Sequence, residues 1–263
     1  MEEQRVSIGI AAAVGPEVAR RIAPAIEQAG FGALWVNDTP GADALEVSAA
    51  AAAVTSRLRV ATGVIAVDRR PAPQLLADLA RLDIPADRLV LGIGSGAARS
   101  GALGLVRDAV DELRQGGVGD IVVGALGPRM RRLAADRADG VLLNWLTPCA
   151  AAEEASEHRA SDGAGRVVLY VRTAAEDDAV PRLEQEAARY ESIPSYAANF
   201  ARRGLAPMDT VILPDGLPGR VERYADVVDE VVLRAVVAQD GPDDYARFVD
   251  RVSESIRETV DAG

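Results

Sequence analysis

The sequence predicts one α/β domain folded as a single (β/α)8 TIM barrel, and three observations lead to this prediction. Short β-branched runs alternate with longer Ala-, Arg-, Leu- and Glu-rich segments of helical spacing from end to end of the 263-residue chain. A (β/α)8 barrel typically needs about 250 residues, so eight such units suit this length. No linker interrupts the pattern, and residues 1–263 are therefore predicted to form one domain. A doubly wound open sheet is the alternative fold.

Eight runs have the composition of buried parallel strands. Ile121–Val123 and Val141–Leu143, for example, are apolar at every position, as strands covered on both faces must be. The short run Thr210–Leu213 is an alternative candidate for the eighth strand. The predicted strands are Val6–Ala12, Ala33–Asp38, Leu58–Val67, Arg88–Ser95, Asp120–Leu126, Gly140–Leu146, Arg166–Thr173 and Val228–Val237.

Proline and glycine mark where several of the intervening helices begin and end. The first helix is predicted between Pro16 and Gly30, because proline suits a first turn and glycine suits a C-terminal cap. Others are predicted to begin near Pro71 and at Pro128. Two more, Pro181–Ser192 and Ser195–Arg203, follow the seventh strand.

The composition excludes several classes of function. With 29 basic residues, all of them Arg, against 40 acidic ones, the net charge of -11 argues against nucleic acid as a partner. A single cysteine, Cys149, excludes an internal disulfide, and a single histidine, His158, argues against a His/Cys metal site and a Ser/His pair. His158 lies in a polar segment and is expected to be solvated. No apolar run reaches the roughly 18 residues of a membrane span, so a soluble, cytoplasmic protein without a membrane partner is expected.

The active site of such a barrel lies at the C-terminal ends of its strands, where two glycine-containing segments occur. In Gly92–Gly96 the glycines leave one strand face without side chains, which suits a flat ligand near the backbone, a tight turn or a thin interior layer. Gly124–Met130 turns from a strand into a helix that begins at Pro128. The N–H groups of Arg129 and the two residues after it are expected to form an anion site at the positive end of that helix.

Two further strand ends carry polar side chains. Asp38 either contacts a ligand or caps the following turn. The segment Asn144–Cys149 brings an amide, an indole and a thiol to one rim position. Trp145 is expected to pack rather than to stack on a ligand, and no histidine is available to activate Cys149.

The chain resembles the luciferase-like monooxygenase superfamily, whose members are (β/α)8 barrels that bind reduced flavin or coenzyme F420. The matching segments follow the family's order over nearly the whole chain, and the block from Gly127-Pro128 to Ala138-Asp139-Gly140 is the most specific and most like the F420 branch. The segments that carry the resemblance are Gly30–Val36 with Asp38, Thr62–Val64, Leu91–Gly96, Gly124–Met130 and Leu133–Asn144.

The resemblance implies a role for each matching position. Asp38 and Asn144 correspond to rim positions near the cofactor ring and are the predicted catalytic residues, while Gly63 and Val64 correspond to a pair joined by a cis peptide behind the ring. The predicted cofactor-binding residues, of which those from 124 onward would hold the phosphate, are Gly63, Val64, Gly94, Ser95, Gly96, Gly124, Ala125, Leu126, Gly127, Pro128 and Arg129. No metal ligand is predicted.

Some positions depart from the family pattern. Thr39 stands where members often have histidine, Ala97 stands where sugar-phosphate-oxidising members have glutamate, and the stretch from Gly96 to Asp120 lacks the long insertion that helps to cover the substrate. These departures put acid/base roles at both positions in doubt.

The resemblance implies an F420-dependent oxidoreductase that moves a hydride between the deazaflavin and a small organic substrate. The alternatives are a monooxygenase using reduced FMN from a separate flavin reductase, and a flavin-binding relative without catalysis. An aldolase of the Schiff-base type is disfavoured because the chain has no lysine. A homodimer is expected through the helices predicted at Asp43–Ser56 and Pro71–Asp83.

Overall fold

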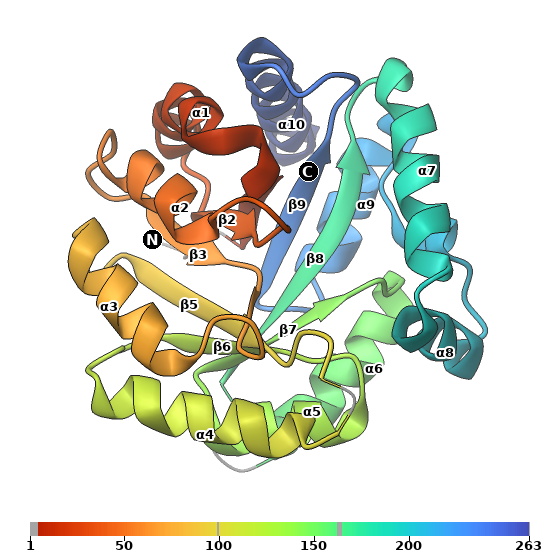
Figure 1. The fold of residues 1–263 in the computed structure, drawn as a ribbon. Coiled ribbons are helices and arrows are strands. Elements are labelled where there is room, and N and C mark those ends of the chain that lie inside the picture. The colour runs from red at the N-terminus through yellow and green to blue at the C-terminus, as the bar shows by residue number, and fades with distance from the viewer. Residues whose placement is uncertain (1–4, 99, 162–164, 263) are drawn as a thin grey trace.

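The strands form one closed parallel barrel surrounded by helices (Figure 1). The structure is a computed structural model that describes residues 5–98, 100–161 and 165–262. Within them, the strand order is β3-β2-β1-β9-β8-β7-β6-β5-β4, and a further pairing of β3 with β5 closes the sheet. Because β3 and β4 occupy one barrel position, the nine strands complete an eightfold barrel. The predicted (β/α)8 barrel is confirmed, and the open sheet is not.

Every predicted strand is present, each within a few residues of its expected bounds. The third prediction is split, because β3 ends at Thr62 and β4 begins at Ile65, with a cis peptide between Gly63 and Val64 as the resemblance implied. The strands are β1 (Val6–Ala11), β2 (Ala33–Asn37), β3 (Arg59–Thr62), β4 (Ile65–Ala66), β5 (Leu89–Gly94), β6 (Ile121–Gly124), β7 (Gly140–Asn144), β8 (Arg166–Ala174) and β9 (Glu230–Val236).

The run at 210–213 is not the eighth strand. Ile212 forms only an isolated parallel bridge with Thr173 of β8, whereas β9 pairs with both β1 and β8. The sheet closes through β9 because its register provides hydrogen bonds along two neighbours.

Helices cover the outside of the barrel, and their ends follow the predicted proline and glycine signals. Gly30, with φ 78°, caps α1, and α5 begins at Pro128. The helices are α1 (Gly15–Ala29), α2 (Ala44–Ala52), α3 (Ala72–Leu82), α4 (Ala102–Gln115), α5 (Pro128–Arg137), α6 (Pro148–Arg159), α7 (Val180–Glu191), α8 (Pro194–Arg203), α9 (Leu217–Ala225) and α10 (Pro242–Ala262). None of the helices in the described ranges has the length and apolar character needed to cross a membrane.

Alternate residues of each strand face two different cores. Along β7, Val141 and Leu143 pack outward against helices, while Leu142 packs inside the barrel. The interior layer also holds Trp35 and Tyr170, whose rings meet edge to face at 5.9 Å. This layer fills the barrel below the strand ends, so a ligand can enter only above it.

Glu27 at the end of α1 caps the loop that leads into β3. Its carboxylate accepts hydrogen bonds from the backbone N–H groups of Ser56, Arg57 and Leu58 at 2.9, 2.6 and 2.8 Å. The bond from Arg57 is the largest influence on the Glu27 carboxyl and holds its pKa below the ordinary value of 4.5, against a smaller opposing effect of burial. This capping explains why α2 ends at Ala52, short of the expected Ser56.

The Glu27→Gln variant is expected to be less stable than the native protein at pH 7 by about 1 kcal/mol, because the carboxylate is partly exposed. A carboxyl whose folded pKa is depressed stabilises the fold above its unfolded pKa, and this contribution is lost as the pH falls through the folded pKa. Urea unfolding from pH 7 to pH 3 should therefore show the two proteins converging as the pH falls. A difference that is constant over this range would contradict the capping role.

Candidate functional site

A cavity of about 510 Å³ opens at the C-terminal ends of the barrel strands, a volume within the usual range for small-molecule sites. Its wall includes Asn37, Gly94, Gly124 and Asn144, each the last residue of its strand. Eleven of the thirteen predicted site residues line it, namely Asp38, Gly63, Val64, Gly94, Ser95, Gly96, Gly124, Ala125, Leu126, Gly127 and Asn144.

Pro128 and Arg129 are the two predicted residues that lie outside this wall. Both are exposed, and Arg129 lines a separate surface hollow with Arg132 and His158. The expected anion site also differs in detail, because the Gly127 carbonyl accepts hydrogen bonds from Met130 and Arg131 N–H, each at 3.1 Å. Two of the three N–H groups expected to hold an anion are therefore engaged within the helix turn.

The glycine-rich wall is packed by a side chain of the chain itself. A Cβ built on Gly94 would lie 2.8 Å from Val64 Cγ2, and one on Gly124 would lie 3.1 Å from both Val64 methyl groups. The missing side chains of these glycines make room for Val64. This arrangement corresponds to the expected thin interior layer. Gly127 differs, because a Cβ there would meet no heavy atom within 4 Å, and its backbone is open to the cavity.

Asp38 is paired rather than free. Its Oδ2 lies 3.0 Å from Arg69 NH2, and both residues line the cavity. Burial raises the pKa of Asp38 above its usual range, and Arg69 opposes this shift only in part. The carboxyl is therefore more easily protonated than an exposed aspartate, a property that suits proton exchange.

Asn144 has an amide oxygen without a partner. Its Oδ1 is buried and accepts no hydrogen bond from any described residue, while its side chain contacts the hydroxyl of Tyr196. Burial raises the pKa of Tyr196, so this hydroxyl stays protonated near neutral pH. Asn144 lines the cavity, and a buried polar atom without a protein partner is normally satisfied by a ligand or by water. This part of the lining is therefore suited to a polar ligand.

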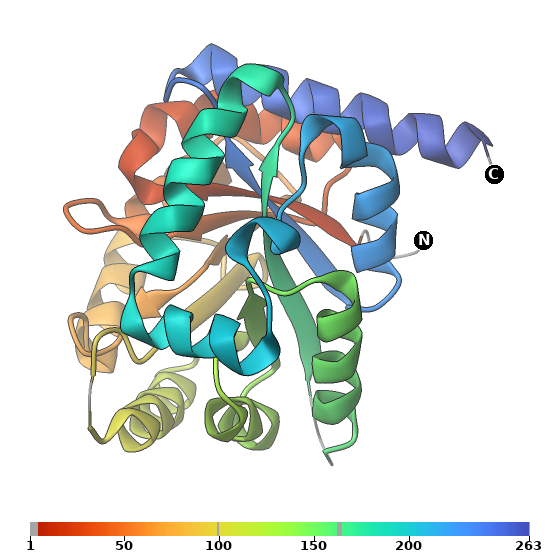
Figure 2. The ribbon, with the colours of Figure 1, turned by 90° about the vertical axis from the view of Figure 1, so that its right-hand side faces the viewer.

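The structure reveals a second wall that sequence reasoning missed. It consists of side chains from β8, β9, α7 and α8. The helices α7 and α8 lie in front of the barrel in Figure 2. Arg172 and Arg234 are single charged residues inside otherwise apolar strand runs, and this signal could have revealed them. The residues of this wall are Arg172, Glu186, Arg189, Tyr190, Ser195, Tyr196 and Arg234.

Two polar residues outside the cavity are buried. His158 is only 3% exposed, and its Nε2 donates to the Gly165 carbonyl at 3.1 Å, so the prediction of a solvated side chain is wrong. Arg131 is also buried, and it pairs with Glu154 and Glu157. Both find tertiary partners that their local sequence does not reveal. Cys149 is exposed and lies outside the cavity.

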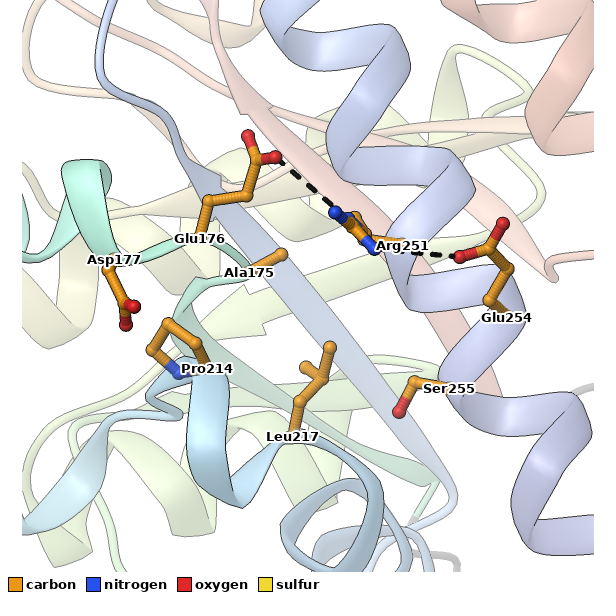
Figure 3. Close-up of a pocket in the computed structure, with 8 residues that line it drawn as sticks. All are labelled: Ala175, Glu176, Asp177, Pro214, Leu217, Arg251, Glu254 and Ser255. Carbon is orange, nitrogen blue, oxygen red and sulfur yellow. Dashed lines mark ion pairs between the residues drawn. The ribbon is translucent and has the colours of Figure 1, made fainter.

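Another surface hollow lies between α10 and the 214–217 segment (Figure 3). Arg251 lies between Glu176 and Glu254, with N–O distances of 3.9 and 4.0 Å. This hollow contains none of the predicted residues and lies on the outer surface, so the cavity at the strand ends is the candidate site.

Comparison with known proteins gives a family match. The model of the luciferase-like monooxygenase family matches residues 4–114. The resemblance to this family is confirmed. A search of the curated proteins found no match.

Solved structures with a similar fold match nearly the whole chain. A monooxygenase from Streptomyces bottropensis is 17% identical with a TM-score of 0.70, over 97% of this chain and 99% of the other. An F420-dependent secondary alcohol dehydrogenase, solved with an F420-acetone adduct, is 14% identical with a TM-score of 0.71, over 98% and 99%. A riboflavin lyase, solved with modified FMN and riboflavin, is 13% identical with a TM-score of 0.66, over 97% and 92%. At these identities the likeness establishes the fold alone.

Proposed function

We propose that this chain is an F420-dependent oxidoreductase that transfers a hydride between the deazaflavin and a small organic substrate. The observation that carries the proposal is the convergence of eleven predicted residues, from five barrel positions, on one cavity at the C-terminal strand ends. That is where barrel enzymes bind their ligands. The match to the luciferase-like monooxygenase family and the similar fold of an F420-dependent secondary alcohol dehydrogenase support the proposal.

The residues present fit such a cofactor. The backbone around Gly127 is open, Val64 and Leu126 supply apolar surface, and Asn144 offers an unpartnered amide oxygen. Leu126 and Gly127 also stand next to the start of α5, whose positive end favours a phosphate. The bound cofactor supplies the hydride chemistry.

The chain's own part in the reaction is to bind, orient and exchange a proton. Asn144 and the protonated Tyr196 hydroxyl contact each other in the cavity lining, where they can donate hydrogen bonds to a substrate oxygen. Asp38, with its raised pKa, is the carboxyl available for proton exchange in the absence of a histidine at position 39. Residues of α7 and α8 cover one side of the cavity.

The test is an anaerobic assay with reduced F420 and a panel of ketones, aldehydes and activated alkenes. The proposal predicts substrate-dependent reoxidation of F420, slowed by Asn144→Ala. If F420 binds and no acceptor reoxidises it, the account of a non-catalytic relative replaces this one.

Reduced FMN is the second candidate cofactor, because fold relatives include a monooxygenase and a protein solved with modified FMN. In that case a separate reductase would supply the reduced flavin. Oxygen consumption with enzymatically reduced FMN, but not with F420, would favour this alternative.

We also propose that the chain forms a homodimer through α2 and α3. Arg70 connects the two helices, pairing with Asp43 at 2.8 Å and with Asp78 at 2.6 Å, so they present one rigid surface. Light scattering at micromolar concentration should give twice the chain mass. A monomer mass would contradict the proposal.

A further inference from the structure

Two arginines stand side by side in the cavity wall. Arg172 on β8 and Arg234 on β9 are register partners, and their side chains are only 3% and 12% exposed. Neighbouring buried charges of one sign are costly unless a counter-charge or a ligand compensates them. Their position therefore calls for a functional reason.

Among the described residues, one carboxylate pairs with both arginines. Glu186 of α7 places Oε1 3.1 Å from Arg172 Nε and Oε2 3.6 Å from Arg234 NH2. Burial opposes ionisation of Glu186, but the charges of Arg234 and Arg172 prevail and hold its pKa below the usual value. Two guanidinium groups with one anionic partner leave a net positive charge in this wall, although the whole chain carries -11.

The guanidinium of Arg172 is oriented but not saturated. It lies over the ring of Trp145 at 4.0 Å and over that of Tyr190 at 4.5 Å, contacts that hold a cation in place. Its NH1 is buried and has no hydrogen-bond partner among the described residues. An unsatisfied buried donor is costly and is typically paired by a bound ligand in a functional site.

We propose that the arginine cluster, defined as Arg172, Arg189 and Arg234, binds the carboxylate of an organic acid that is the substrate. This proposal rests on the proposed function and adds the chemical class of its substrate. A guanidinium matches a planar carboxylate in two parallel hydrogen bonds. Arg189 is exposed at the cavity wall and provides a third cation, while Tyr190 and Tyr196 supply aromatic surface for the body of the acid.

The cluster is separate from the part of the wall expected to hold the cofactor phosphate. That part lies after β6. In the sheet order β7 stands between β6 and β8, which carries Arg172, and both β7 and β8 stand between β6 and β9, which carries Arg234. Glu186 acts as a positioning residue, because it bridges the two guanidinium groups. It contacts Arg172 through Nε and leaves NH1 without a partner.

Calorimetric titration with benzoate and with benzamide tests the proposal, since the two probes have the same shape and differ in charge. Benzoate is expected to bind the cofactor-free protein at least about tenfold more tightly than benzamide, a difference of about 1.4 kcal/mol. Arg172→Gln is expected to weaken benzoate binding at least about tenfold and the exposed Arg189→Gln about threefold or more, with little effect on benzamide. Arg182→Gln is the matched control, because Arg182 is on α7 but pairs with Asp240 outside the cavity.

Several results would overturn the proposal. Equal binding of benzoate and benzamide would remove the carboxylate from the argument, as would native benzoate affinity in both cluster variants. If Arg172→Gln does not fold, benzoate binding by the exposed Arg189→Gln variant still tests the proposal, with a loss of about threefold or more expected. If the variants weaken FMN but leave riboflavin unchanged, the cluster binds the cofactor phosphate and the substrate assignment is wrong.

The experiment also separates this proposal from the proposed function. Benzoate binding is measured without cofactor, so a protein that binds benzoate but neither F420 nor FMN would contradict only the proposed function. A protein that binds F420 but does not distinguish benzoate from benzamide would contradict only the substrate class.

Discussion

The Ser95→Phe variant is expected to bind the cofactor about a hundredfold more weakly than the native protein, a loss of about 2.8 kcal/mol. Ser95 follows β5 directly and lines the cavity, so a phenyl ring there occupies space that the ligand needs. Because residue 95 is partly exposed, the larger side chain is tolerated by the fold. Fluorescence titration measures the affinity.

Ala97→Phe provides the control for that experiment. Ala97 is exposed two residues further along the same loop and does not line the cavity. The control should bind the cofactor as the native protein does. Native affinity in Ser95→Phe, or an equal loss in both variants, would show that the cofactor binds elsewhere.

Gly92→Ala is expected to lower the free energy of unfolding by about 3 kcal/mol, at the upper end of typical overpacking costs. A Cβ on Gly92 would lie 1.8 Å from the carbonyl oxygen of Thr62. Thr62 cannot move away easily, because its hydroxyl exchanges hydrogen bonds with the backbone N–H and C=O of Gly92, both at 2.9 Å. β3 and β5 must therefore separate where they close the barrel. Urea unfolding measures the loss.

Gly104→Ala is the matched control. Gly104 lies inside α4, where a Cβ would meet no heavy atom within 4 Å. Since alanine favours a helix over glycine by about 1 kcal/mol, this variant should be slightly more stable than the native protein. Equal stability of Gly92→Ala and the native protein would contradict the close approach of β5 to Thr62.

The strands and the glycine-rich wall of the cavity were predictable because local patterns determine them. A continuous apolar run such as that of β6 must be buried on both faces, and strand ends gather at one end of any parallel barrel. The strand pattern therefore placed Asn144 and Gly124 at the end of the barrel where the cavity lies. The alternation of faces also places Asn37 inside the barrel, and its amide donates to the Gly63 carbonyl at 2.5 Å.

The arginine wall was not predictable because it depends on tertiary partners. Arg172 is stable inside the barrel only because Glu186, Trp145 and Tyr190 arrive from other elements. The position of α7 and α8 over the cavity is set by packing of Leu183 and Phe200 around Trp145, which no local period encodes. The same reason explains the buried His158, whose partner is the Gly165 carbonyl.

Parallel titration of the native protein with F420 and with FMN tests the central claim, that the cavity at the strand ends binds a flavin-type cofactor. The account predicts saturable binding of F420 that is tighter than that of FMN and is lost in Ser95→Phe. Binding of neither cofactor, or binding that Ser95→Phe leaves unchanged, would contradict it.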